Sequence, residues 1–307
     1  TERIAAHIAH MRPWVSAFLA PGSTGGGWEM SEKETTALLD FLTAEAVRQD
    51  YSLMAGVLRT EQGTVVPAIK SILDRFADGK SDAAALSAKK MCGFTVTPPK
   101  GADLDQSVIR RELEAIAETG APIAIYQLPQ ITENEMAPET VEHLVATYPN
   151  VYLMKDTSGK DHVVLAEKDL ANLFLVRGAE GDYATWIKSN GGYYDGFLLS
   201  TANSFAAELG TMIDHLMNGA VDDASRLSEQ ISTVVSSVFA EAAKLPFGNP
   251  FANANKAIDH HRAWGPRATE VAPPTTHSGN RLPEELIHHA GEQLRRYEFE
   301  IGSGYMN

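Results

Sequence analysis

Short apolar runs alternate with segments of helical periodicity from the start of the chain to about residue 205. Apolar runs of about four to eight residues, bounded by turn residues, are typical of buried strands. We predict seven such strands, at residues 15–21, 52–58, 92–96, 122–129, 151–155, 173–176 and 196–199. Helical spacing predicts helices at residues 1–10, 31–48, 67–76, 82–89, 105–119, 138–147 and 183–189. Ser31 and Glu34 form a capping box that opens the second of these helices.

This alternation indicates a parallel sheet with helices outside it, and the continuous apolar character of the strands indicates that both faces are covered. Eight such units close an α/β TIM barrel, (β/α)8, and seven strands can be counted here. Beyond residue 205 we predict helices at 222–244 and 283–297, and we assign none to segment 248–280, which holds several Pro, Gly and Asn residues. The predicted domains are a barrel core at 1–204 and, at 205–307, the last barrel helix with a C-terminal helical domain.

Composition and charge narrow the class of protein. The chain has 307 residues, an apolar fraction of 44%, a formal charge of −14 and a pI of about 5.1. This acidic balance disfavours nucleic acid and anionic lipid as partners. The apolar runs are shorter than the ~20 residues of a membrane-spanning helix. The single cysteine, Cys92, and the lack of a leader-like start predict a cytoplasmic protein.

Lys155 ends the apolar run that begins at Val151 and is followed by the turn residues Asp156 to Gly159. A lysine at the end of a buried strand escapes the cost of a buried charge by losing its proton, and a neutral amine attacks ketones. The alternative is that the side chain reaches out of the strand and pairs with Asp156.

Further polar residues lie at the carboxyl ends of other predicted strands, where barrel enzymes carry their chemistry. Tyr126 and Lys155 lie on consecutive strands and can face one mouth. Ser23 and Thr24 lie in a glycine-rich turn whose backbone N–H groups and hydroxyls suit a small carboxylate. Turn chemistry alone would also explain Ser23 and Thr24, and packing alone would explain Tyr126.

The motifs resemble those of the N-acetylneuraminate lyase and dihydrodipicolinate synthase superfamily over about residues 10–245. They are Gly22-Ser23-Thr24-Gly25, Thr97-Pro98, Tyr126-Gln127-Leu128-Pro129, Lys155-Asp156-Thr157-Ser158-Gly159, Gly181-Asp182 and Gly196-Phe197-Leu198-Leu199-Ser200 with Ala202-Asn203. The resemblance implies an eight-stranded barrel with a C-terminal helical extension, and it places the family's first strand before Thr1. It also implies a homotetramer or homodimer.

The same resemblance implies the roles of individual residues. Lys155 would form an imine with a 2-keto acid such as pyruvate, and Tyr126 would shuttle protons. Ser23 and Thr24 would hold the carboxylate of the keto acid. The remaining residues that would line the substrate site are Gly181, Leu198 and Ile131.

Three departures from the family pattern bear on the substrate. Pro99 and Lys100 follow the Thr-Pro pair where synthases carry a tyrosine, and Ile131 replaces the arginine that binds a second carboxylate. Gly26 stands in place of the glutamate of the usual Gly-Thr-Thr-Gly-Glu. We therefore expect a neutral aldehyde, and not aspartate semialdehyde, as the second substrate.

The predicted reaction is retro-aldol cleavage or aldol condensation through a lysine imine, without metal or organic cofactor. Two alternatives remain open: a sugar-acid dehydratase that uses the same imine, and a keto-acid or sugar-acid binding protein without turnover. The histidine pairs His260-His261 and His288-His289 lack the spacing of a metal site, and Gly25 to Gly27 lack the pattern of a nucleotide-binding loop.

Overall fold

A seven-stranded parallel sheet, with its strands in chain order, organises the computed structural model, which describes residues 1–170 and 172–307. The strands are β1 (Ala17–Ala20), β2 (Ser52–Val57), β3 (Met91–Val96), β4 (Ile123–Gln127), β5 (Val151–Asp156), β6 (Phe174–Arg177) and β7 (Gly196–Phe197). Each strand pairs in parallel with the next, and β1 and β7 form the two edges within the described residues. All seven predicted strands are present, and the predicted barrel-type α/β fold is confirmed.

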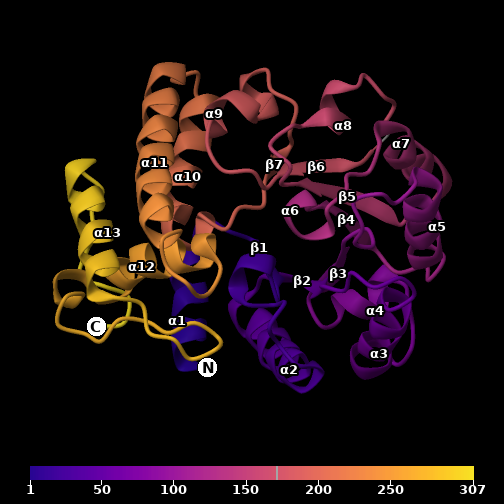
Figure 1. The fold of residues 1–307 in the computed structure, drawn as a ribbon, viewed down its shortest axis with the longest axis horizontal. Helices are drawn as coiled ribbons and strands as arrows, with labels where there is room; N and C mark the ends of the chain where they lie inside the picture. Colours follow the sequence, from indigo (N-terminus) through magenta and orange to yellow (C-terminus); the bar gives the residue numbers. More distant parts are fainter. Residues whose placement is uncertain (171) are drawn as a thin grey trace.

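Helices connect the strands and follow the outside of the curved sheet (Figure 1). They are α1 (Glu2–Met11), α2 (Glu32–Gln49), α3 (Val65–Ala77), α4 (Ala83–Ser87), α5 (Gln106–Ala117), α6 (Pro129–Thr132), α7 (Pro138–Thr147), α8 (His162–Leu165) and α9 (Tyr183–Trp186). The predicted capping box opens α2: the Glu34 N–H donates to Ser31 Oγ over 3.3 Å, and the Ser31 N–H donates to Glu34 Oε2 over 2.8 Å. Local side-chain chemistry therefore fixes where this helix begins.

The two faces of the sheet bury different amounts of apolar surface. On the outer face, side chains from alternate strand positions form one large core with the helices, which includes Ile125 of β4 and Ile109 of α5. The inner face holds a smaller cluster formed by Met54, Ala124, Leu153 and Val176. The outer core therefore holds most of the barrel's buried apolar residues, as expected for a sheet wrapped by amphipathic helices.

Four long helices form the C-terminal part and lie together at one end of the molecule (Figure 1). They are α10 (Ala202–Met217), α11 (Val221–Ala242), α12 (Pro250–Trp264) and α13 (Glu284–Arg296). Their apolar faces form a second core, which also takes up Tyr183 and Ile187 from the segment before β7. This core is separate from the outer core of the barrel.

Two predictions of helices need correction. Segment 248–280, to which no helix was assigned, contains α12, which begins after the N-cap Asn249 with Pro250 in its first turn. Its buried face carries polar residues such as Asn253 and His260, so it lacks the apolar stripe that marks a helix in the sequence. The helix predicted at 183–189 ends at Trp186, because Ile187 has an extended backbone.

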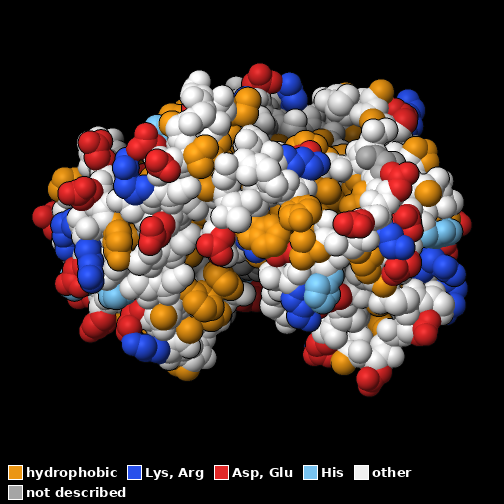
Figure 2. Space-filling view, turned by 90° about the horizontal axis from the view of Figure 1, so that it is seen from above, with side chains coloured by type: hydrophobic (Ala, Val, Ile, Leu, Met, Phe, Trp, Pro, Cys, Tyr) orange, Lys and Arg blue, Asp and Glu red, His pale blue; other side chains and the backbone are white. Residues whose placement is uncertain are grey.

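The surface agrees with the mixed, acidic composition. Figure 2 shows Lys and Arg side chains scattered among acidic ones on one face of the molecule. Among the described residues, no helix is long and apolar enough to cross a bilayer.

Candidate active site

Lys155 and Tyr126 are neighbours on the inner face of the sheet, at the carboxyl ends of β5 and β4. They are register partners in the parallel pairing of these strands. The Nζ atom of Lys155 lies 4.3 Å from the centroid of the Tyr126 ring, so the amine sits over the face of the ring. Both side chains are buried, with 9% of Lys155 and 2% of Tyr126 exposed. The structure thus brings together the two residues that the sequence placed on consecutive strands.

Neither polar group of this pair has a hydrogen-bond or ion-pair partner among the described residues. Within residues 1–170 and 172–307, the Lys155 amine makes no hydrogen bond or ion pair, and the Tyr126 hydroxyl makes no hydrogen bond. Buried polar groups normally find partners, so an unpartnered amine and hydroxyl side by side are available to a ligand.

Apolar residues from β6 and from the end of β7 lie near Lys155 on the inner face of the sheet. Val176 is the register partner of Lys155 on β6, and it packs with Leu153 in the inner cluster. Leu198, two positions after the paired residue Gly196, packs against the same cluster while remaining partly exposed. Leu198 therefore lies near the Lys155 layer of the barrel, where the resemblance expects a substrate contact.

Asp156 does not pair with Lys155, which excludes the alternative considered from the sequence. Successive residues of a strand face opposite sides, and the Asp156 carboxylate lies on the outer side, where it accepts a hydrogen bond of 2.7 Å from the Ser158 N–H. Burial raises the pKa of the Asp156 carboxyl, and the Asp161 carboxylate raises it further, against the effect of the Ser158 hydrogen bonds.

A buried ion pair lies beside Asp156 on this outer side. The Arg177 guanidinium donates from Nε and Nη2 to the two carboxylate oxygens of Asp161, over 3.1 and 3.2 Å. The Tyr194 hydroxyl donates to Asp161 Oδ1 over 2.6 Å, and the Trp186 ring lies 4.5 Å from the Arg177 guanidinium carbon. The sequence analysis missed this cluster, whose members are distant in sequence.

The turn after β1 has the composition predicted for a carboxylate site, but some of its N–H groups are already used. Residues Ser23–Gly25 form a 3-10 turn, in which the N–H groups of Gly25 and Gly27 both donate to the Gly22 carbonyl. The Ser23 hydroxyl accepts a hydrogen bond of 2.8 Å from the Trp28 indole. In the described chain no hydrogen bond occupies the Thr24 hydroxyl, which is therefore the group most open to a ligand.

Gly26 has a conformational reason to replace the family's glutamate. Its φ of 80° lies in the left-handed region, and a Cβ there would lie 3.3 Å from the His277 Cβ. A side chain at this position would be strained, which explains why glycine stands here.

Two other expected substrate residues, Ile131 and Gly181, follow the carboxyl ends of β4 and β6. Ile131 lies on α6, directly after β4, and is partly buried. Gly181 follows β6 with φ 89°, and its carbonyl accepts a hydrogen bond of 3.0 Å from Arg177 Nη1. A further carboxylate, Glu180, accepts hydrogen bonds from the Ser200 hydroxyl at 2.8 Å and the Thr201 N–H at 3.1 Å. Its place just after a strand was the only sequence signal for Glu180.

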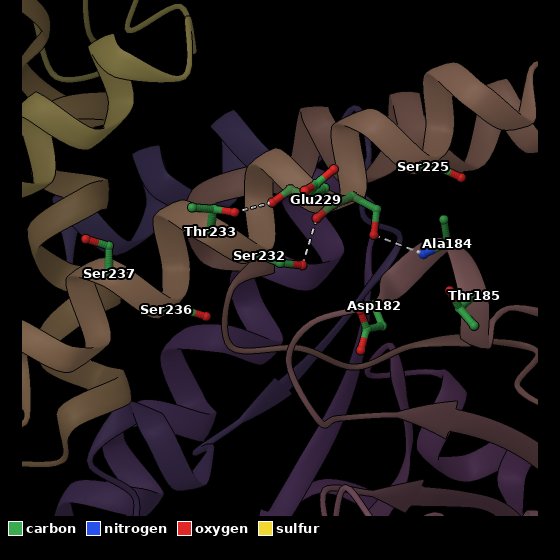
Figure 3. Close-up of a pocket in the computed structure, with 10 residues that line it drawn as sticks. Asp182, Ala184, Thr185, Ser225, Glu229, Ser232, Thr233, Ser236 and Ser237 are labelled. Carbon is green, nitrogen blue, oxygen red and sulfur yellow. Dashed lines mark hydrogen bonds between the residues drawn. The ribbon is translucent and has the colours of Figure 1, made fainter.

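Surface grooves elsewhere do not include the lysine. A groove of about 750 Å³ between α9 and α11 is lined by hydroxyl and acidic side chains and contains neither Lys155 nor Tyr126 (Figure 3). Its hydroxyls are largely used within the protein: Ser232 Oγ donates to the Ser228 carbonyl over 2.7 Å, and Thr233 Oγ1 donates to the Glu229 carbonyl over 2.8 Å. The chemistry predicted from the sequence is therefore not located there.

The paired histidines have structural partners. His260 and His261 are buried and reach the carbonyls of Ala268 and Ile287, each over 2.8 Å, and burial lowers the pKa of both. His289 contacts the Ser237 hydroxyl over 3.0 Å. Across the described ranges, no three His, Cys, Asp or Glu side chains are grouped as metal ligands.

Comparisons with known proteins relate the chain to one family. The model of the Dihydrodipicolinate synthetase family matches residues 103–252. A 4-hydroxy-tetrahydrodipicolinate synthase from Thermoanaerobacter sp. (strain X514) is 25% identical over 239 residues, which cover 77% of this chain and 75% of the relative. A relative of the same name from Parasynechococcus marenigrum (strain WH8102) is 27% identical over 246 residues, 80% of this chain and 75% of the relative.

Solved structures share the whole fold. A prophage protein of the dihydrodipicolinic acid synthase family from E. coli K12, solved in complex with pyruvate, superposes with a TM-score of 0.71 at 18% identity, covering 96% of this chain and 91% of its own. A dihydrodipicolinate synthase from Bacillus anthracis gives a TM-score of 0.72 at 15% identity, with 96% and 91% covered. The motifs, the family model and the sequence relatives agree, and the chain is similar to the N-acetylneuraminate lyase and dihydrodipicolinate synthase superfamily of aldolase-type enzymes.

Proposed function

We propose that this protein is a carbon–carbon lyase of the lysine-imine type that acts on a 2-keto acid. The observation that carries the proposal is the buried, unpartnered amine of Lys155 over the ring of Tyr126, at the carboxyl ends of two adjacent barrel strands. Barrel enzymes place their reacting groups at this end of the sheet. The pyruvate complex of the structurally similar prophage protein supports a keto acid as the ligand class.

In the first step, the Lys155 amine attacks the ketone carbon of the keto acid, and loss of one water molecule with uptake of one proton gives an iminium ion. The iminium withdraws electrons from the neighbouring carbon. In a 4-hydroxy substrate the bond between C3 and C4 then breaks, which leaves an enamine on Lys155 and releases an aldehyde. Protonation of the enamine at C3 and hydrolysis of the resulting imine return the keto acid and the free lysine.

Tyr126 serves as the proton carrier in this scheme. Its hydroxyl has no hydrogen-bond partner in the described chain, so it can bond to the substrate. Cleavage requires removal of the proton from the C4 hydroxyl, and a proton must later reach C3. One positioned phenol can perform both transfers, directly or through the substrate carboxylate.

The carboxylate of the keto acid would lie in the turn after β1. Thr24 offers a free hydroxyl there, and Ser23 offers a second hydroxyl that already accepts from Trp28. Gly181 and Leu198 would line the rest of the site from the ends of β6 and β7. These roles follow the family motifs, residue by residue.

The aldehyde half of the substrate would be neutral. Ile131 supplies an apolar side chain where synthases of the family carry an arginine for a second carboxylate. Lys100, which follows the Thr-Pro pair in sequence, is paired with Glu133 over 3.0 Å, and about half of each side chain is exposed. A flexible lysine that already has an acidic partner cannot replace a fixed arginine fork.

The sequence relatives are named as 4-hydroxy-tetrahydrodipicolinate synthases, so condensation with aspartate semialdehyde is the competing activity to test. Ile131→Arg should raise the rate with this acidic aldehyde relative to neutral aldehydes, whereas Ile131→Leu should leave the preference unchanged. Wild-type rates with aspartate semialdehyde that match those with any neutral aldehyde would overturn the proposed specificity.

Borohydride reduction tests the imine itself. The protein is incubated with pyruvate or a panel of longer 2-keto acids, reduced, digested and mapped by mass spectrometry. We expect the adduct on Lys155 alone. Adducts on another lysine, or spread over surface lysines, would contradict the proposal, and binding of pyruvate without any adduct would favour a binding protein.

We also propose that the protein self-associates as a dimer or tetramer and works in the cytoplasm, as the family resemblance implies. Sedimentation velocity at micromolar concentration tests the assembly. A single monomeric species across the concentration range would contradict it.

A further inference from the structure

Gly178 lies against the side chain of Lys155, directly after β6. Its N–H donates to the Asp156 carbonyl over 2.6 Å, which holds the loop against the end of β5. A Cβ atom built on Gly178 would lie 2.6 Å from Cε of Lys155 and 2.4 Å from Cγ2 of Thr157. Contacts below about 3.0 Å between such atoms do not occur without a shift.

The backbone does not require glycine at this position. The φ angle of Gly178 lies outside the left-handed region, so alanine could adopt the same backbone without strain. Several other glycines of the chain, such as Gly26 and Gly181, have φ angles of 80° and 89° and are explained by conformation. At Gly178 the missing side chain is explained by the space that Lys155 and Thr157 occupy.

We propose that Gly178 is a positioning residue for the amine of Lys155. The methylene stem of Lys155 passes the bare backbone of Gly178, and its Nζ atom lies 4.3 Å from the Tyr126 ring centroid on the neighbouring strand. A side chain at Gly178 would displace Cε and, with it, the amine. This inference rests on the proposed function, in which Lys155 is the nucleophile. A displacement of about 1 Å at a reacting atom can cost on the order of 10²-fold in rate.

The first test is the rate constant for borohydride-trapped adduct formation with pyruvate in Gly178→Ala. We expect a decrease on the order of 10²-fold relative to wild type, measured at equal concentrations of folded protein. Gly196→Ala is the matched control, because Gly196 lies on the adjacent strand and the nearest atom to its built Cβ is 4.0 Å away. The control should react at the wild-type rate.

A Cβ at position 178 would also clash with Thr157, and the effect of this clash on the trapping rate can be measured separately. Thr157→Ser removes Cγ2 but keeps the hydroxyl that donates to the Gln127 carbonyl over 2.8 Å. The double variant Thr157→Ser/Gly178→Ala therefore retains only the clash with Lys155. We expect it to react as slowly as Gly178→Ala, whereas full recovery in the double variant would overturn the proposal.

A readout that needs no catalysis separates this inference from the proposed function. Reductive methylation with 13C-formaldehyde labels lysine amines, and the signal of Lys155, assigned with Lys155→Arg, should be shifted upfield by the Tyr126 ring. Gly178→Ala should move that signal toward the position of exposed lysines, and Gly196→Ala should not. An unchanged signal and trapping rate in Gly178→Ala would overturn the inference. If the wild type forms no adduct with any keto acid, the proposed function fails and the NMR shift still decides the positioning role.

Discussion

The two faces of β5 carry neighbouring residues with opposite environments. On the inner face, Lys155 is buried beside Tyr126 and has neither a hydrogen bond nor an ion pair within the described chain. On the outer side, Asp161, which lies in the loop after β5, is bonded to Arg177 and Tyr194 at the same end of the barrel. The outer side supplies the Asp161 carboxylate with partners, although one carboxylate oxygen of Asp156 on the same side has none among the described residues.

This difference separates two uses of buried polar groups. A carboxylate that receives three hydrogen bonds from an arginine and a tyrosine has its desolvation cost offset, and it holds segments of the chain together. An amine that contacts only the face of an aromatic ring gains less stability from its place in the barrel than a carboxylate with three hydrogen bonds. Residues in such unpartnered positions are candidates for reaction, and those in saturated positions are candidates for structure.

Lys155→Met should have the largest effect on activity, because it removes the nucleophile and keeps a side chain of similar length. We expect turnover to fall by at least about 10³-fold while the melting temperature stays the same or rises. Lys160→Met, which alters an exposed lysine on the loop after β5, is the matched control and should keep wild-type activity. If Lys155→Met turns over at the wild-type rate, Lys155 is not the nucleophile.

Asp161→Asn should have the largest effect on stability. Asp161 is 1% exposed, and its loss leaves the buried Arg177 charge without its carboxylate, which typically costs about 3–5 kcal/mol. Urea unfolding measures the change. The double variant Asp161→Leu/Arg177→Met removes both charges and should lose less than Asp161→Asn alone. A greater loss in the double variant would show that packing, and not the unpaired charge, dominates.

Tyr126→Phe should slow turnover by about 10²-fold, because positioned proton transfer contributes that much, while borohydride trapping at Lys155 continues. Tyr152→Phe, which changes a second tyrosine of the inner face, is the control and should leave turnover unchanged. An equal loss in trapping and in turnover for Tyr126→Phe would show that the hydroxyl already acts in imine formation, because phenylalanine keeps the ring.

The barrel and the Lys155–Tyr126 pair could be predicted because both depend on local pattern. Strand alternation sets which face a side chain takes, and parallel neighbours bring their carboxyl ends together, so two residues at the ends of consecutive strands meet. The family motifs then added the roles of Ser23, Thr24, Gly181, Leu198 and Ile131, which remain predictions. Their distances to the amine depend on loop geometry that no periodicity encodes.

Other features left no readable signal. Asp161, Arg177 and Tyr194 meet through the folding of three separate segments, so their pairing is a tertiary property. Helix α12 was missed because its buried face is polar. Gly178 is one of 24 glycines, and only the position of the Lys155 side chain distinguishes it from the others.

A second saturated cluster, far from Lys155 in sequence, allows the smallest and most specific prediction. His7 Nδ1 lies 3.1 Å from the Asp259 carboxylate, its Nε2 lies 3.2 Å from Asn203 Oδ1, and the Tyr305 hydroxyl donates to Asp259 over 2.9 Å. Burial alone would lower the pKa of His7, but the Asp259 carboxylate outweighs it, so the pKa of His7 is raised above 6.5. Burial opposes ionisation of Asp259 too, yet His7 holds the pKa of Asp259 below 3.8.

Both shifts give a defined pH window for this cluster. The folded state binds the His7 proton more tightly than the unfolded state, so the stabilisation is complete below pH 6.5 and is lost as the pH rises through the raised pKa. The contribution of ionised Asp259 is lost at the acid end, as the pH falls from 3.8 through its depressed pKa.

Between pH 6 and 9 the melting temperature of the wild type should therefore fall by roughly 2–4 °C more than that of His7→Gln, which corresponds to about 1 kcal/mol. His288→Gln, at an exposed histidine of α13, should keep the wild-type pH profile. If His7→Gln keeps that profile too, the His7–Asp259 contact is not a charged pair in solution, and saturation of a buried carboxylate by neighbours is not by itself a sign of a stabilising role.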